Sequence, residues 1–145
     1  MKGNEMRSYV RAAMVTALLV AATACAASST EVSGSYVSVG SHRSTMMIAR
    51  KQDLVRIELK GGGNPKDLAS MAGDCEAVAE GQLSGGVIRA KLVPFEGEVT
   101  SLDAKDIEQI DPVVLVSFEK GIATVQGSFA HCGLRNALNG RYKKR

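Results

Sequence analysis

The chain of 145 residues carries few side chains of the kinds that catalyse reactions. Its only histidines are His42 and His131, and its cysteines are Cys25, Cys75 and Cys132. The Gly-x-Ser-x-Gly motif that exposes a nucleophilic serine is absent, and the neighbours of the histidines form no triad pattern. We therefore assign no catalytic residue and no cofactor, and an enzyme is the last of three functional hypotheses.

Residues 1–24 have the composition of a secretory signal peptide. Lys2, Arg7 and Arg11 precede an uncharged stretch of 13 residues from Ala12 to Ala24. This stretch is too short to span a bilayer as a helix, but it has the length of the apolar region of a signal peptide. We expect export and removal of this segment. The alternative is a buried N-terminal helix.

The end of this segment, Ala21-Ala22-Thr23-Ala24-Cys25, resembles the lipobox of bacterial lipoproteins. Ala22 stands where that pattern usually has Leu. The resemblance implies that Cys25 is lipidated and becomes the first mature residue of a periplasmic protein anchored in the outer membrane. The alternative is ordinary cleavage after Ala26, which would give a soluble periplasmic or secreted protein.

Cys75 and Cys132 remain as an even pair in an oxidising compartment, where disulfides persist. We expect a disulfide between them, and closing so long a loop contributes about 4 kcal/mol on a chain-entropy estimate. A metal site formed with His131 is the alternative, but it lacks a fourth ligand and any C-x-x-C spacing. We therefore assign no metal site.

Residues 1–24 hold three of the 18 basic residues and one of the 15 acidic residues, which leaves the rest of the chain with a net charge of +1. This balance gives no support for a nucleic-acid partner. The small and polar residues 25–33 suit a flexible tether. We expect residues 34–145 to form a single domain.

This domain shows the alternation of β-strands almost throughout. In 54–60, Val55, Ile57 and Leu59 share one face while charged side chains share the other, as in a strand wetted on one side. No window shows a convincing helical stripe. The pattern predicts eight strands at about 34–39, 45–51, 54–60, 75–83, 87–93, 113–119, 122–129 and 137–143.

Three of the connections have the length of hairpin turns, and in an up-and-down meander they fall at one end. The longer connections then fall at the other end, and so do Cys75 and Cys132. Gly34-Ser35-Tyr36 and Gly140-Arg141-Tyr142 begin and finish the domain with the same Gly-x-Tyr motif. We expect an eight-stranded antiparallel up-and-down barrel in which the first and last strands pair, because closure removes exposed edges. An open sandwich is the alternative.

Two of the long connections carry the capping residues of short helices. Asn64 and Pro65 predict a helix over 65–72, which ends before Gly73. Thr100-Ser101-Leu102-Asp103 matches a capping box, which predicts a second helix over 101–108.

The signal, the Gly-x-aromatic first strand, the meander and the single cysteine pair together resemble the lipocalin-like small barrels of the bacterial envelope. Lipocalins usually have Gly-x-Trp where this chain has Gly34-Ser35-Tyr36, and the chain contains no Trp. The resemblance implies a lipid-binding barrel or an inhibitor of envelope enzymes. It transfers no functional residue.

The first functional hypothesis is a non-catalytic envelope module whose loops at the long-loop end bind a protein or glycan, as an inhibitor or an adaptor. The second is a carrier of a small apolar ligand in the interior, which only a cavity would permit. The third is an enzyme. The candidate binding residues of the first are His42, Arg43, Lys66, Asp67, Glu96, Asp103, His131 and Arg135.

Overall fold

The computed structural model describes residues 31–40, 43–62, 75–132 and 138–145. These residues belong to one compact unit, Glu31–Arg145. The signal segment, Cys25 and the predicted helix over 65–72 lie outside the described residues. They remain predictions from the sequence.

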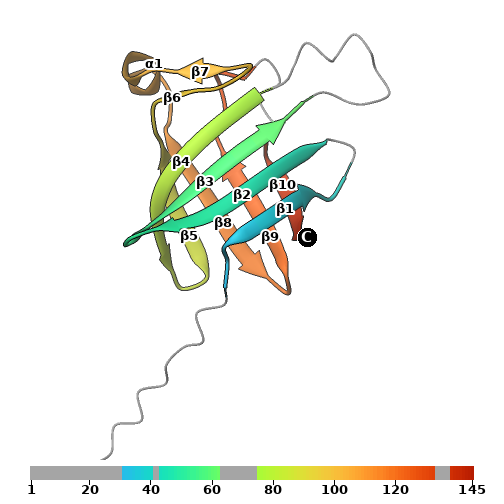
Figure 1. The fold of residues 1–145 in the computed structure, drawn as a ribbon. Helices are drawn as coiled ribbons and strands as arrows, with labels where there is room; N and C mark the ends of the chain where they lie inside the picture. Colours follow the sequence, from blue (N-terminus) through green and yellow to red (C-terminus); the bar gives the residue numbers. More distant parts are fainter. Residues whose placement is uncertain (1–30, 41–42, 63–74, 133–137) are drawn as a thin grey trace, which may run out of the picture. The chain divides into compact units, whose positions relative to one another are not determined.

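Eight strands close into an antiparallel barrel in the order β1-β10-β9-β8-β5-β4-β3-β2 (Figure 1). A separate two-stranded sheet, β6 with β7, and one short helix complete the described structure. The elements are β1 Gly34–Ser38, β2 Ser44–Lys51, β3 Leu54–Gly61, β4 Cys75–Ser84, β5 Val87–Leu92, β6 Phe95–Glu96, β7 Ser101–Leu102, α1 Ala104–Glu108, β8 Val113–Glu119, β9 Ile122–Gly127 and β10 Gly140–Lys144.

The predicted fold class is confirmed. Each of the eight predicted segments overlaps one barrel strand, and β1 pairs with both β2 and β10. Because that double pairing leaves β1 no free edge, the open sandwich is excluded. The tight turns after β2, β4 and β8 lie at one end of the barrel, as the meander requires.

The structure corrects the predicted helix over 101–108. Residues Ser101–Leu102 form strand β7, and the helix begins at Ala104 with Asp103 as its N-cap. The Asp103 carboxylate accepts a hydrogen bond from the Asp106 amide at 2.8 Å, which is the capping-box contact moved three residues along the chain. Asp and Thr are both favourable N-cap residues, so the motif alone does not determine where the helix starts.

Helix α1 has five residues. No helix in the described part of the chain is long and apolar enough to cross a membrane.

The interior of the barrel is packed with side chains that form one contiguous apolar cluster. Alternation along each strand places them inward, and small residues of β4 and β5 face larger ones of β3 and β8. The inward-facing side chains, each at most 4% exposed, are Tyr36, Met46, Ile48, Val55, Ile57, Leu59, Ala77, Ala79, Ile88, Ala90, Leu92, Val114, Val116, Ala123, Val125 and Tyr142.

The two tyrosines of the Gly-x-Tyr motifs make the same contact at the two ends of the domain. The Tyr36 hydroxyl donates to the Val32 carbonyl at 2.7 Å, and the Tyr142 hydroxyl donates to the Leu138 carbonyl at 2.8 Å. In both cases the acceptor lies four residues earlier and its own side chain is buried. Each tyrosine therefore holds the segment that precedes its strand against the core.

The glycines of these motifs permit the bend that the contact needs. Gly34 and Gly140 have φ angles of 138° and 129°, a region that favours glycine over every other residue. Each bend lies two residues before an inward-facing tyrosine in adjacent strands, since Ser38 pairs with Tyr142 and Tyr36 with Lys144. The expectation that Gly-x-Tyr marks the seam of the barrel is confirmed.

Replacing the Tyr142 hydroxyl tests this contact. Tyr142→Phe leaves the Leu138 carbonyl without its donor, so the free energy of unfolding at pH 7 should fall by about 1 kcal/mol. Burial raises the pKa of Tyr142 to about 12, against an opposing hydrogen bond with Ser44. Unfolded tyrosine ionises near pH 10, so the wild-type protein should lose up to about 1.4 kcal/mol per pH unit between pH 10 and 12.

Urea unfolding from pH 7 to pH 11 measures both effects. The variant lacks this phenol, so its deficit should shrink above pH 10. Parallel profiles for the two proteins would contradict a buried, hydrogen-bonded Tyr142.

Candidate functional site

A pair of cysteines lies at the long-loop end of the barrel. Cys75, the first residue of β4, and Cys132, which follows β9, lie at disulfide distance with their Cα atoms 5.5 Å apart. Both are buried. The pairing expected from the cysteine count therefore has the required geometry, and it ties β4 to the segment after β9.

His131 lies beside this pair. Its Nε2 atom is 3.7 Å from the Cys132 sulfur and 3.0 Å from the Glu76 carbonyl oxygen, to which it can donate. Cys75, His131 and Cys132 thus bring three metal-ligating atoms within 4.8 Å of one another. Since the sulfurs are placed to bond each other rather than to act as thiolates, the arrangement favours the disulfide over the metal alternative.

The connection between β5 and β8, residues 93–112, forms a flap at the mouth of the barrel, beside the start of β4 (Figure 1). It is attached through the Val93 amide, which donates to the Val78 carbonyl at 2.9 Å. Val78 points outward from the barrel and yet is only 8% exposed, and Leu102 of β7 is 2% exposed. Leu102 belongs to the same buried apolar cluster as the barrel interior, and Phe95 of β6 packs against that cluster, so the flap is seated on the core.

Glu76 is buried beneath this flap. It is 6% exposed although it lies on the outer side of β4, and its Oε1 atom is 3.0 Å from the Lys60 ammonium of β3. Its Oε2 atom is buried, and the backbone amides of Glu98 and Val99 approach the carboxylate from the flap. A β-carbon on Gly97 would meet this carboxylate and the Thr100 carbonyl, so the turn of the flap closes directly over Glu76.

The electrostatics of this contact keep Glu76 charged. Burial raises the pKa of Glu76, but the Lys60 ammonium and the backbone amides of Val99 and Glu98 outweigh it, so the net shift is downward. The carboxylate in turn raises the pKa of Lys60. The pair is therefore ionised at neutral pH and links β3 to β4, while the backbone amides of Glu98 and Val99 tie the flap to the Glu76 carboxylate.

Two adjoining pockets follow the base of the flap, and together we call them the flap groove. The first, of about 290 Å³, is lined by Arg43, Glu98 and Val99 together with Lys60 and Glu76. The second, of about 150 Å³, shares Lys60 and Glu76 and continues past the flap strand β6 towards Arg56. The groove offers cations, carboxylates and backbone polar groups within reach of one ligand.

A wider depression of about 640 Å³ lies on the flap itself, lined by Phe95, Glu96, Leu102 and Asp103 among others. Of the predicted binding residues, Arg43 lines the flap groove, Glu96 lines both the groove and this depression, and Asp103 lines the depression.

His131 contacts the backbone of Glu76. The structure thus places all four described candidates around the flap. His42, Lys66, Asp67 and Arg135 lie outside the described residues.

Lys60, Glu76 and Glu98 line the groove without having been singled out in the sequence. Alternation correctly put Lys60 and Glu76 on the outer face of β3 and β4, where charged residues are normally solvated. Their burial depends on where the flap folds, and that is a contact between distant segments.

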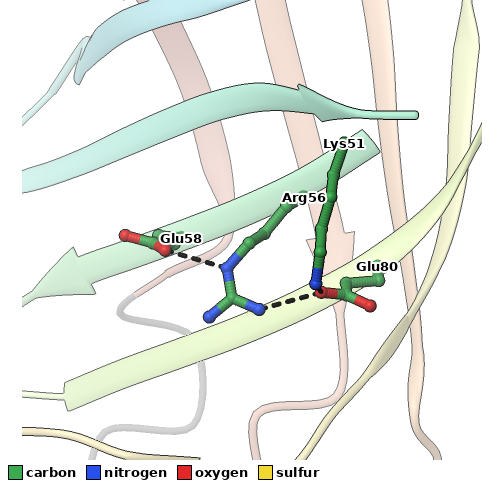
Figure 2. A network of polar contacts seen from close by, with 4 residues as sticks. All are labelled: Lys51, Arg56, Glu58 and Glu80. Carbon is green, nitrogen blue, oxygen red and sulfur yellow. Dashed lines mark hydrogen bonds and ion pairs between the residues drawn. The ribbon is translucent and has the colours of Figure 1, made fainter. Parts of the chain in front are cut away.

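The outer wall below the groove carries a network of paired charges. Figure 2 shows Arg56 between two carboxylates, with its Nε atom 2.9 Å from Glu58 and its Nη1 atom 2.9 Å from Glu80. Lys51 approaches the same Glu80 oxygen at 3.8 Å. Because these groups satisfy one another, this wall has no unpaired cation or carboxylate among the four residues of the network.

The described chain is in class an eight-stranded antiparallel β-barrel with a folded flap at its mouth. Comparison with protein-family models, with curated proteins and with solved structures found no match. The barrel has the layout that the lipocalin-like resemblance implies, and membership of that class stays a prediction.

The Gly97→Ala substitution tests how the flap is seated. The added methyl group meets Glu76 and Thr100, so the turn must move, at a cost of about 1–3 kcal/mol if the flap resists. Hydrogen exchange should become faster in residues 93–103 and stay unchanged in β4 and β5. Ser101→Ala, an exposed change in the same flap, is the control, and equal exchange in both variants would show that Gly97 does not seat the turn.

The Glu76 carboxylate gives the flap a dependence on pH. Its folded pKa lies below the ordinary value of 4.5, so its stabilisation is complete above that value and is lost as the pH falls through the lowered pKa. Glu76→Gln should be less stable than wild type at pH 7 and should approach it in acid. Urea unfolding from pH 7 to pH 3 measures this, with the exposed Glu108→Gln as control. A constant deficit at every pH would exclude Glu76 as the acid-sensitive group.

Proposed function

We propose that this protein is a non-catalytic binding module of the cell envelope that engages a protein or glycan through the flap groove. The observation that carries the proposal is the packed interior of the barrel, whose inward side chains are buried from Tyr36 to Tyr142. A ligand must then bind outside the barrel interior, and the described pockets around Glu76 lie at the mouth and the outer wall.

The chemistry of the groove favours a polar partner with both donors and acceptors. Lys60 and Glu76 are fixed by their ion pair, while Arg43 and Glu98 are exposed on the rim of the first pocket. Rigid polar groups in a shallow groove suit a peptide backbone or the hydroxyl groups of a glycan better than an apolar ligand. Val99, which is 60% exposed beside them, adds an apolar contact.

The disulfide and the flap keep this surface in one arrangement. Cys75 lies at one wall of the first pocket and is paired with Cys132 behind it. A binding loop that is already ordered loses less entropy when its partner binds. This rigidity is what an inhibitor or an adaptor requires, and it needs no catalytic group.

The signal segment and the Cys25 lipobox support an envelope location, with the barrel anchored to the outer membrane by a lipid on Cys25. The tether of small and polar residues, 25–33, leads directly into β1. The alternative with ordinary cleavage leaves the same barrel soluble in the periplasm or secreted. Intact mass of the mature protein distinguishes the two.

Paired double variants test the groove. Arg43→Ala with Glu98→Ala removes one cation and one anion from the rim, while Arg50→Ala with Glu119→Ala removes the same charges at the opposite end. All four side chains are exposed, so both proteins should fold. In affinity capture from an envelope extract, the groove variant should retain at most a tenth of the partner that wild type binds, and the control should retain it all.

Equal capture by both variants would place the binding surface elsewhere. Co-purification of an apolar ligand, detected by native mass spectrometry, would instead favour the carrier. A wild-type protein that captures nothing above an empty matrix would refute the binding module.

A further inference from the structure

Four neighbouring strands of the barrel contain no acidic residue. Strands β1, β2, β9 and β10 have the sequences GSYVS, STMMIARK, IATVQG and GRYKK. They are adjacent in the order β2-β1-β10-β9 (Figure 1). Their outer surface, which we call the basic face, is therefore free of carboxylates across its whole width, whereas β3 and β4 on the other side of the barrel hold Glu58, Glu76 and Glu80.

Strand β2 contributes Arg50 and Lys51 at its C-terminal end, where Lys51 pairs with Glu80, and the other cations of the basic face come from the end of the chain. Tyr142 points into the core, so alternation turns Arg141, Lys143 and Arg145 outward, and all three are exposed. None of them forms an ion pair with a described residue. Lys144, on the other parity, donates to the Glu31 carbonyl instead.

Apolar side chains are interleaved with these cations. Val37 of β1 lies opposite Lys143, and the Val39 amide donates a hydrogen bond to the Arg141 carbonyl. Met47 lies opposite Ser35, whose carbonyl accepts from the Arg145 amide.

Val39 is 50% exposed and Met47 is 47% exposed. The face combines positive charge with accessible apolar groups.

Carboxylates stand only at the borders of this surface among the described residues. Glu58 of β3 lies opposite Met47, Glu119 of β8 lies opposite Ile122, and Glu31 precedes β1. Glu58 is bonded to Arg56, and Glu31 accepts from the Ser33 amide. These groups do not neutralise Arg141, Lys143 or Arg145, so the positive charge of the face is available to a partner.

We propose that the basic face rests on an anionic phospholipid surface. Charge complementarity requires a negative partner, and exposed Val and Met side chains between Arg and Lys are the composition that favours the interface of an anionic bilayer. The face is the convex outside of four strands, which a broad surface can cover. It begins at β1, the strand into which the predicted lipid-bearing tether leads. An acidic protein or glycan is the competing occupant, and the test separates it.

The basic face adjoins the flap groove at Thr45, an exposed residue of β2, but none of its cations and exposed apolar side chains lines the groove. Docking of the basic face would leave the groove and its partner unaffected. Failure of one proposal is therefore distinguishable from failure of the other.

Vesicle binding by two matched double variants tests the proposal. Both are made in the full chain with Cys25→Ser, so that no acyl chain contributes, and are purified after export. Arg141→Gln with Lys143→Gln removes two cations from the basic face. Arg89→Gln with Lys91→Gln removes two exposed cations from β5, where Lys91 lies opposite Glu80. The probes are vesicles of phosphatidylglycerol mixed with phosphatidylcholine, and of phosphatidylcholine alone.

The parent chain should sediment with the anionic vesicles and stay free of the neutral ones, and added salt should release it. Each cation contributes roughly a fivefold change in binding, so the basic-face variant should bind roughly 25-fold more weakly. The β5 variant should bind like its parent. Val39→Ser with Met47→Ser should also weaken binding, with the salt dependence unchanged.

Equal losses in the two double variants would overturn the proposal, because net charge alone would then explain binding. So would absence of binding to anionic vesicles, or equal binding to neutral ones. Retention on an immobilised polyanion such as heparin, without vesicle binding, would assign the face to an acidic macromolecule. Each variant should unfold at the same temperature as the parent, which shows that the loss of binding does not come from a loss of fold.

Discussion

Closure of the barrel by its first and last strands is the constraint on which the rest of the structure depends. Pairing of β1 with β10 removes the last free edge, and it exists because Gly34 and Gly140 allow the chain to bend where Tyr36 and Tyr142 turn inward. The two hydroxyls hold the flanking segments against the core. Without this seam the sheet would be open, and neither the packed interior nor the mouth could form as described.

The sequence predicts the barrel well because its evidence is local. Alternation in 54–60, short turns and the repeated Gly-x-Tyr motif each depend on neighbouring residues, and together they determine strand positions and the end at which the cysteines meet. The start of α1 was misplaced because Thr100 and Asp103 are both good N-caps. The residue at which the helix starts depends on the β6–β7 pairing. Each of these strands has only two residues, which is too few for alternation to indicate a strand.

The candidate site could be predicted only as a set of loop residues. Arg43, Glu96, Asp103 and His131 lie around the flap, at the long-loop end of the barrel. Glu76 and Lys60 were missed because alternation describes which face a side chain occupies, and not whether a distant segment covers that face. The flap covers the outward-facing Glu76 and so buries its carboxylate. The site therefore depends on a contact between distant segments, which the periodicity of the sequence does not reveal.

Pairing of residues 34–38 with the strand at 140–144 also has a kinetic consequence. Every other neighbouring pair in the barrel is separated by a much shorter stretch of chain, so these can form early and locally. The seam alone must wait until the C-terminal strand is present, and it closes the longest loop in the fold. During synthesis the nascent sheet therefore exposes two open edges, which makes shielding by a chaperone most valuable before the last strand emerges.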